Sequence, residues 1–266
     1  MTQELAPTPP PRPRAAPSLL ARARPWLAAA GAALVVADLA IEGVARRYVV
    51  AESVQFVVFA MVAPALIVLG APWQPLRLSG PLDRLAAARR RQTSFVRASA
   101  FLAVFIAVTV AWRVPPVMDA LASHLLLVLP ELVTLLAAGT GLCLELVSSP
   151  PLSPRLPNPH RAAVAALAMW STWAVAYALG LSNHPVFRGY DPAGGALSAV
   201  ADQQITVALV WAVSAFCFVP VVFVTLLTWL SASDNPDEEL QRLARDERRH
   251  PVVRGWSRPA RGRPGS

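Results

Sequence analysis

Long apolar runs alternate with short blocks of charged and proline residues along the chain. Each run is close to the roughly 20 residues that a helix needs to cross a bilayer. The pattern predicts about six transmembrane helices, over residues 26–44, 54–71, 96–112, 121–147, 162–181 and 205–230. The blocks between them are expected to be loops, because proline, glycine and charge gather there. The expected fold is therefore an all-α, polytopic transmembrane helix bundle.

Composition agrees with a membrane protein rather than with a soluble domain. Of the 266 residues, 55% are apolar and 15% are charged, and the mean hydropathy is +0.46. Residues 1–25, rich in proline and arginine, are expected to form a disordered cytoplasmic tail, and residues 231–266 a charged one. The membrane domain then covers residues 26–230. Its first run is expected to remain as a signal anchor, because Asp38 and Glu42 continue the same helix.

All 24 basic residues are arginines, and their distribution sets the expected orientation. Twenty of the 24 lie in the two tails and in the second and fourth loops, against four in the other three loops. Because cytoplasmic loops keep positive charge during insertion, both termini are predicted to be cytoplasmic. Arginines that flank membrane spans do not make the basic stripe of a nucleic-acid interface. The expected surroundings are therefore membrane lipid, and no nucleic acid is expected as a partner.

Several polar residues lie within or beside the apolar runs, and most of them are expected near the outer face. An ionised acid near the middle of the bilayer costs about 2.5–3.5 kcal/mol, so these side chains should face the interior of the bundle. We therefore expect them to converge in one polar or metal-binding cluster. Its candidate members are Asp38, Glu42, Glu52, Gln55, His124, Glu131, Asp202 and Gln203.

Parts of this set have alternative interpretations. Asp38, Glu42 and Arg46 follow at intervals of four, so they form either a ladder that reaches the interface or a functional acid pair. His124 and Glu131 are seven residues apart and share one helical face. They would suit a divalent ion or a proton relay, whereas a lone histidine near a helix end is more often interfacial.

Other titratable groups in the runs have simpler expected roles. Glu145, near the cytoplasmic end of the fourth run, is expected to meet Arg155 or Arg161. Cys143 and Cys217 lie inside apolar runs, without the spacing of a disulfide framework or a cysteine metal site. We expect both to pack as small hydrophobes rather than to bind copper.

A series of short motifs runs along the chain. The series comprises residues 52–56 (ESVQF), 63–64 (AP), 70–73 (GAPW), 112–115 (WRVP), 131–132 (EL) with Gly139 and Gly141, 150–151 (PP), 154–155 (PR), 169–170 (MW) with Trp173 and Tyr177, and 202–204 (DQQ) before Trp211. In this order the motifs make the chain, from about Tyr48 to Leu240, resemble the CtaG-type cytochrome c oxidase assembly family, which is linked to caa-type oxidases.

The resemblance implies a multi-pass protein of the bacterial cell membrane that helps a haem-copper oxidase mature. Its implied partners are oxidase subunits, and copper insertion at the outer face is one implied route. Many members are histidine-rich where the second and fourth runs begin, whereas here Phe56 and Leu132 stand at the neighbouring positions. Copper(I) prefers thiolate, thioether and imidazole ligands, so a site made of Glu52, Glu131 and Asp202 would suit it poorly.

Three functions are compatible with these features. The first is an assembly factor that acts by protein contact and not as an enzyme, because no catalytic triad, phosphate loop or HExxH motif occurs. The second is a small proton- or cation-coupled membrane transporter that uses the intramembrane acids. The third is a purely structural subunit whose polar residues only join helices.

Overall fold

The computed structural model describes residues 19–73, 84, 86–89, 92–182, 184–190, 198–232, 240–241 and 244–245. These residues form helices and one isolated β-bridge but no strand, which confirms the all-α prediction. The helices are α1 (Leu19–Leu39), α2 (Glu42–Ala45), α3 (Val49–Val57), the π-helix η1 (Val58–Val62), α4 (Ala63–Gly70), α6 (Ser94–Trp112), α7 (Pro115–Ser123), α8 (Leu125–Leu146), α9 (Asn158–Gly180) and α10 (Ala199–Ala232). Most of the two predicted tails lies outside the described residues.

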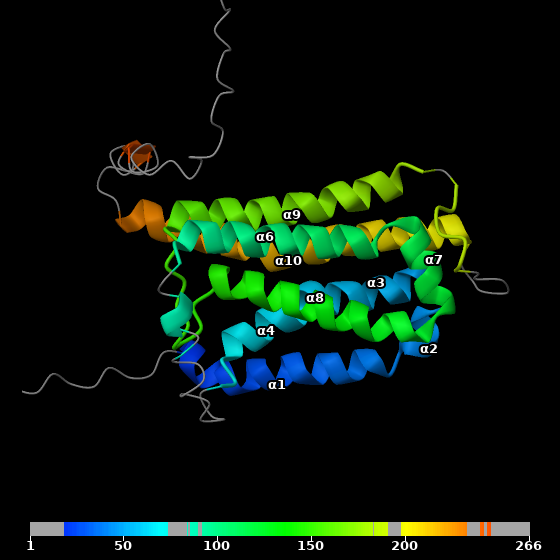
Figure 1. The fold of residues 1–266 in the computed structure, drawn as a ribbon, viewed down its shortest axis with the longest axis horizontal. Helices are drawn as coiled ribbons and strands as arrows, with labels where there is room; N and C mark the ends of the chain where they lie inside the picture. The colour runs from blue at the N-terminus through cyan, green and yellow to red at the C-terminus, as the bar shows by residue number, and fades with distance from the viewer. Residues whose placement is uncertain are drawn as a thin grey trace, which may run out of the picture.

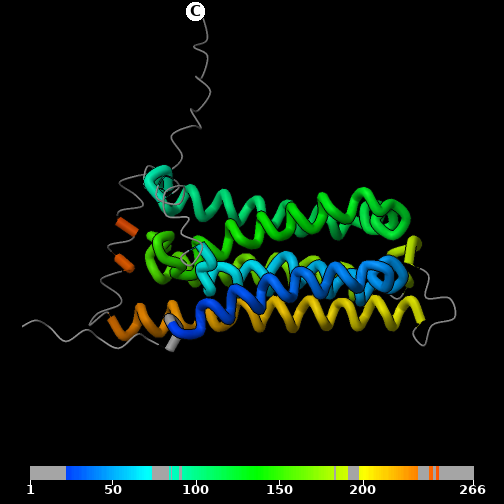
Figure 2. Tube along the Cα trace, turned by 90° about the horizontal axis from the view of Figure 1, so that it is seen from below, coloured from blue at the N-terminus to red at the C-terminus, as the bar shows by residue number. Residues whose placement is uncertain are grey.

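The long helices lie side by side in a bundle (Figures 1 and 2). Five segments of the described chain are long and apolar enough to cross a membrane: Val49–Gly70, Ser94–Trp112, Leu125–Leu146, Asn158–Gly180 and Ala199–Ala232. α1 is not among these five, but it runs along the bundle and packs against α4. The prediction of a polytopic transmembrane bundle is therefore confirmed. α1 begins and α10 ends at the same end of the bundle, and the side of the membrane on which this end lies remains a prediction.

The first predicted span is interrupted before its end. α1 ends at Leu39 and α2 begins at Glu42, because the Ile41 N–H bonds to the carbonyl of Asp38, three residues back, at 3.1 Å. This tight turn replaces the four-residue hydrogen bonding of an α-helix. The expectation that Asp38 and Glu42 continue one helix is therefore wrong.

The fourth predicted span is divided in the same way. Pro115 and Pro116 open the short helix α7, where their missing N–H groups break no hydrogen bond. His124 then takes an extended conformation (φ −119°, ψ 98°), and α8 begins after it. The loop expected between the third and fourth runs and the start of the fourth run thus contain a separate helix, α7, at one end of the bundle (Figure 1).

The second span contains one π-helical turn, η1, just before Pro64. Proline lacks an N–H, and its ring displaces the carbonyl four residues back, which here belongs to Ala60. Gly139 of α8 packs against this turn: a Cβ there would collide with the Ala60 carbonyl oxygen and lie 2.8 Å from Cγ of Pro64. The contact between α8 and the second span thus depends on a glycine facing a widened turn.

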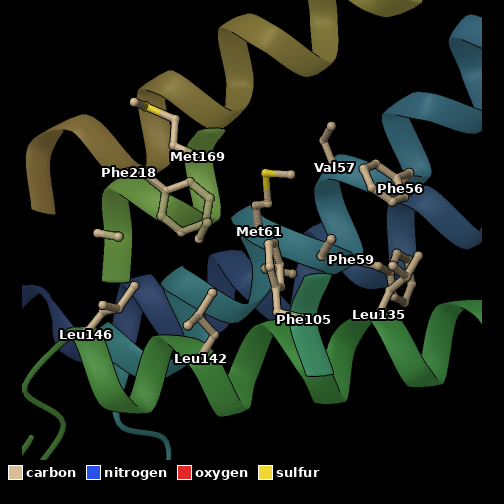
Figure 3. Packing of buried hydrophobic residues seen from close by; sticks show 14 of the residues in the cluster. Phe56, Val57, Phe59, Met61, Phe105, Leu135, Leu142, Leu146, Met169 and Phe218 are labelled. Atoms are coloured by element: carbon tan, nitrogen blue, oxygen red, sulfur yellow. The ribbon is translucent and has the colours of Figure 1, made fainter. Parts of the chain in front are cut away.

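The apolar core fills the space between these helices (Figure 3). Phe105 of α6 and Phe218 of α10 meet edge to face, with ring centroids 6.1 Å apart, and Met61 of η1 belongs to the same buried cluster. Large apolar side chains also cover the outside, where Leu126 is 88% and Phe216 is 82% exposed. Such an exterior suits contact with lipid rather than with water.

Candidate functional site

Arg113 and Glu52 form a buried ion pair where α6 ends and α3 begins. Arg113 caps the C-terminus of α6, and its Nη1 donates to Oε2 of Glu52 at 2.5 Å and to Oγ of Ser53 at 3.0 Å. The guanidinium carbon lies 3.9 Å from the centre of the Phe56 ring, a cation–π contact. Two spans are thereby joined by a charge-assisted hydrogen bond inside the bundle.

Glu131 of α8 adds a second buried carboxyl group to this pair. The charges that act most strongly on the Glu131 carboxyl group are those of Glu52 and Arg113, so the two carboxyl groups lie close together. Oε1 of Glu52 and Oε1 of Glu131 are buried and receive no hydrogen bond from a donor in the described residues. One arginine balances one carboxylate, so the centre is neutral when a single proton is shared by the two acids. We call the end of the bundle that holds Glu52, Arg113 and Glu131 the acid-rich end.

A very small cavity lies on the other side of Arg113. It measures about 10 Å³ and is lined by Arg113, Phe56, Thr109 and Thr206, among others. Nε and Nη2 of Arg113 and Oγ1 of Thr206 are buried without a partner in the described chain. The cavity has room for about one water molecule, which could bridge these donors.

Asp38, Gln55 and Glu42 lie beside the acid-rich centre. Nε2 of Gln55 donates to the backbone carbonyl of Asp38 at 2.9 Å, and both residues are buried. Glu42 and Glu52 are the charged neighbours of Asp38. Arg46 donates instead to the carbonyl of Ala122, at 3.2 and 3.3 Å from its two nitrogens. Of the two alternatives for Asp38, Glu42 and Arg46, the ladder is therefore not formed, since Arg46 bonds elsewhere.

Asp202 and Gln203 bind backbone groups. Asp202 accepts hydrogen bonds from the N–H groups of Val49 (2.8 Å) and Val50 (2.9 Å), the first residues of α3. It thus serves as the N-cap of α3 from another helix, since Tyr48 makes no side-chain cap bond.

Both the oxygen and the nitrogen of the Gln203 side-chain amide form hydrogen bonds. Its Oε1 accepts from the Val186 N–H at 2.9 Å, and its Nε2 donates to the Leu179 carbonyl at 2.8 Å. It thereby fixes the end of α9 and the chain that follows. The structure therefore does not bring the eight candidate residues into one cluster. Glu52 and Glu131 lie close together, with Asp38, Gln55 and Glu42 beside them. Asp202 and Gln203 bind backbone groups, and His124 is exposed at the α7–α8 junction.

Two residues near the centre were absent from the predicted cluster. Arg113 appears in the sequence analysis only within the motif 112–115 (WRVP), although its position in an arginine-poor loop is a signal that it has a partner inside the bundle. Tyr190, between α9 and α10, is buried and has Glu52, Arg113 and Glu131 among its charged neighbours. Burial raises the pKa of the Tyr190 hydroxyl, so it stays protonated beside these groups.

A second arginine–carboxylate centre lies at the opposite end of the bundle, which we call the arginine-rich end. Arg97 donates from Nε to Glu145 Oε1 at 2.7 Å and from Nη2 to Oε2 at 2.9 Å, and Arg89 Nη2 donates to Oε1 at 2.5 Å. Glu145 is fully buried, while the Arg97 side chain is 5% and the Arg89 side chain 13% exposed. Burial lowers the pKa of Arg89, and the Glu145 carboxylate opposes this shift.

The expected partners of Glu145 were wrong. Arg161 donates from Nε to the Leu146 carbonyl at 3.0 Å, and Arg155 lines a pocket without bonding to the described residues. Arg89 and Arg97, counted in the sequence only as topological charge, are the ion-pair partners of Glu145.

The donor chemistry of both centres does not fit copper(I). Within the described ranges, no group of three or more His, Cys, Asp or Glu residues is arranged to hold a metal ion. The available groups are carboxyls, guanidinium groups, amides, hydroxyls and one thioether, that of Met118, which accepts from Arg113 Nη1 at 3.6 Å. Copper(I) favours several sulfur and imidazole ligands together, and a single thioether among carboxyls does not provide them. Cys143 and Cys217 are free thiols outside both centres.

Comparison with known proteins identifies the family. No curated protein and no solved structure gives a significant match. The family described as cytochrome c oxidase caa3 assembly factor (Caa3_CtaG) matches residues 10–232, which is most of the chain. The match spans every membrane helix described above and both arginine–carboxylate centres. The chain therefore belongs to the cytochrome c oxidase caa3 assembly factor family.

Proposed function

We propose that this protein works in the bacterial cell membrane as a non-catalytic factor that contacts a subunit of the caa3-type oxidase during assembly. Family membership supports oxidase assembly, but it does not support copper insertion or ion transport for this chain. The buried polar groups bond chiefly to one another and to helix ends. Among the described residues, the apolar outside of the helices is the surface that we propose for the partner.

An exposed tryptophan cluster on α9 and α10 is the observation that carries the proposed contact. Trp173 stacks on Trp211, with ring centroids 4.8 Å apart, and meets Trp170 at 5.2 Å. Trp170 is 59% and Trp211 is 41% exposed. Trp170 lies near the middle of the 23-residue α9, whereas lipid-anchoring tryptophans lie at the membrane surfaces. Tryptophan is enriched where proteins bind one another, which favours a transmembrane helix of an oxidase subunit as the occupant.

Complementation of a deletion strain tests this contact. Truncating an interface tryptophan can cost about 2 kcal/mol or more, roughly thirtyfold in affinity. The double variant Trp170→Ala/Trp211→Ala should therefore reduce assembled oxidase several-fold while its own abundance stays normal. Trp26→Ala, which removes a 78% exposed tryptophan on α1, is the matched control and should assemble oxidase normally.

The outcome is measured as oxidase activity and oxidase haem absorbance per unit of membrane protein, with immunoblots of the assembly factor. Normal oxidase in the deletion strain would refute the assembly role. Normal oxidase in the double variant would refute the tryptophan surface alone.

The acid-rich centre is proposed to act by holding α3, α6 and α8 together. Glu131→Gln and Asp202→Asn should then change oxidase assembly only in proportion to their effect on protein abundance. If Glu131→Gln abolished assembly at normal abundance and thermal stability, the centre would have a direct role in maturation.

A further inference from the structure

A polar pocket opens at the arginine-rich end, outside the candidate site. It has a volume of about 220 Å³ and is lined by Arg89, Arg97, Arg155 and Ser153, together with residues of the short segment before α6 and of the loop after α8. A single water molecule needs only about 10–15 Å³. The pocket can therefore hold a polar group much larger than one water.

The pocket is positively charged and has unused donors. Three arginines meet there, and Glu145 pairs with two of them, Arg89 and Arg97. The three nitrogens of the Arg97 guanidinium donate hydrogen bonds to the Glu145 carboxylate and to the backbone carbonyl of Arg89. Arg89 bonds through Nη2 alone, and Arg155 makes no bond to the described residues, so donors of both remain available. An anion with several oxygens would satisfy them.

An apolar pocket of about 230 Å³ adjoins this polar one. Phe101 and Leu144 form part of its wall, and it shares Arg89 and Arg97 with the polar pocket. Two compartments, one basic and one apolar, thus meet at the same two guanidinium groups. A free inorganic anion would use only the first compartment, whereas a lipid would use both.

The position along the helices matches the depth of lipid headgroups. Arg97 is in the first turn of α6, Glu145 is next to the last residue of α8, and Arg155 lies in the loop beyond. Basic pockets between transmembrane helices at this depth bind anionic headgroups.

We propose that these adjoining pockets form a binding site for an anionic phospholipid. Its phosphate accepts hydrogen bonds from Arg89 and Arg155, and one acyl chain lies against Phe101 and Leu144. Arg97, held by Glu145, forms the floor between the two compartments. This site is separate from the tryptophan cluster of the proposed oxidase contact.

Lipid binding to the purified full chain tests the site. Phosphatidylglycerol, phosphatidylcholine and inorganic phosphate are each added to the protein in neutral detergent, and bound lipid is counted by native mass spectrometry. Phosphatidylglycerol should bind in preference to phosphatidylcholine, and phosphate should not displace it. Arg155→Gln should weaken phosphatidylglycerol binding about fivefold, as expected for one arginine near a membrane surface.

Two further variants keep the result interpretable. Arg188→Gln removes an exposed arginine between α9 and α10 and should leave binding unchanged. Leu144→Asn places a polar group in the apolar wall and should weaken phosphatidylglycerol binding without creating a preference for phosphate. Equal binding of both lipids, equal loss with Arg188→Gln, or phosphate competition at the affinity of phosphatidylglycerol would overturn the proposal.

Discussion

The two ends of the bundle each bury an arginine–carboxylate centre, but they combine the two charges in opposite proportions. At the acid-rich end, Glu52 and Glu131 share Arg113. At the arginine-rich end, Arg89 and Arg97 share Glu145. One helix, α8, supplies an acid to both centres, and the separation of fourteen positions between Glu131 and Glu145 corresponds to about 21 Å and nearly four full turns. The two centres therefore lie on the same face of α8.

This difference in charge accompanies a difference in space: the acid-rich end has only a very small cavity, whereas the arginine-rich end has a large pocket. A carboxyl group can take up a proton and become neutral, whereas a guanidinium keeps its charge. Surplus acids can therefore be buried without a second cation, and the cavity beside Arg113 measures only about 10 Å³. Surplus arginines need an anion from outside, and the pocket beside Arg89 and Arg97 measures about 220 Å³.

Removing Glu145 should have the largest effect. Glu145→Ala leaves Arg89 and Arg97 buried without their carboxylate, and breaking a buried pair in this way costs about 3–5 kcal/mol. The measurement is the free energy of unfolding in mixed micelles, followed by helical circular dichroism. Glu42→Ala is the control, because Glu42 pairs with no arginine in the described residues. Equal losses in both variants would contradict the role assigned to Glu145.

Removing Arg113 should cost less than removing Glu145. Arg113→Met takes away the cation of the acid-rich end, at about 2–3 kcal/mol near neutral pH. The loss should grow as the pH rises, because ionised Glu52 and Glu131 repel each other, and shrink at acidic pH, where protons neutralise them. Unfolding measured across a pH series tests this. A loss independent of pH would mean that the two acids do not interact.

Hydropathy was sufficient to predict the bundle, because a long apolar run has few alternatives to a membrane helix. It could not show where helices break. Residues 40–41 and 124 lie in sequence that continues the apolar pattern, and local backbone bonds end the helices there. The cost of an acid in lipid led us to expect Glu52 and Glu131 in the interior, and the structure brings them together.

The sequence does not indicate which groups bind Asp202, Arg89 and Arg97. Asp202 binds backbone N–H groups of α3 about 150 residues away in the chain, and backbone groups look alike in every sequence. Arg89 and Arg97 were counted with all other loop arginines, since a topology count does not distinguish a buried arginine from a solvated one.

The spacing of the two centres depends on the packing of α8 between them. Gly139→Ala would place a Cβ against the carbonyl of Ala60 and 2.8 Å from Pro64, both on the second span. Overpacking of this kind should cost about 2 kcal/mol, because backbone must move. Gly43→Ala is the matched control, since nothing lies within 4 Å of a Cβ there. The measurement is again the free energy of unfolding, and similar values for the two variants would contradict the close contact.

The smallest effect should come from Asp202, which lies at the acid-rich end without belonging to its charge balance. Asp202→Ala removes the hydrogen bonds to Val49 and Val50 and should cost about 1 kcal/mol, the usual value of an N-cap. Asp202→Asn should recover part of this, because its amide oxygen can still accept one bond. Gln204→Ala, at the exposed neighbouring position, should change stability by less than about 0.5 kcal/mol. Asp202→Asn could instead alter the pH dependence of unfolding as strongly as Arg113→Met. Asp202 would then belong to the interacting acids, and the proportion of two acids to one arginine at this end would be wrong.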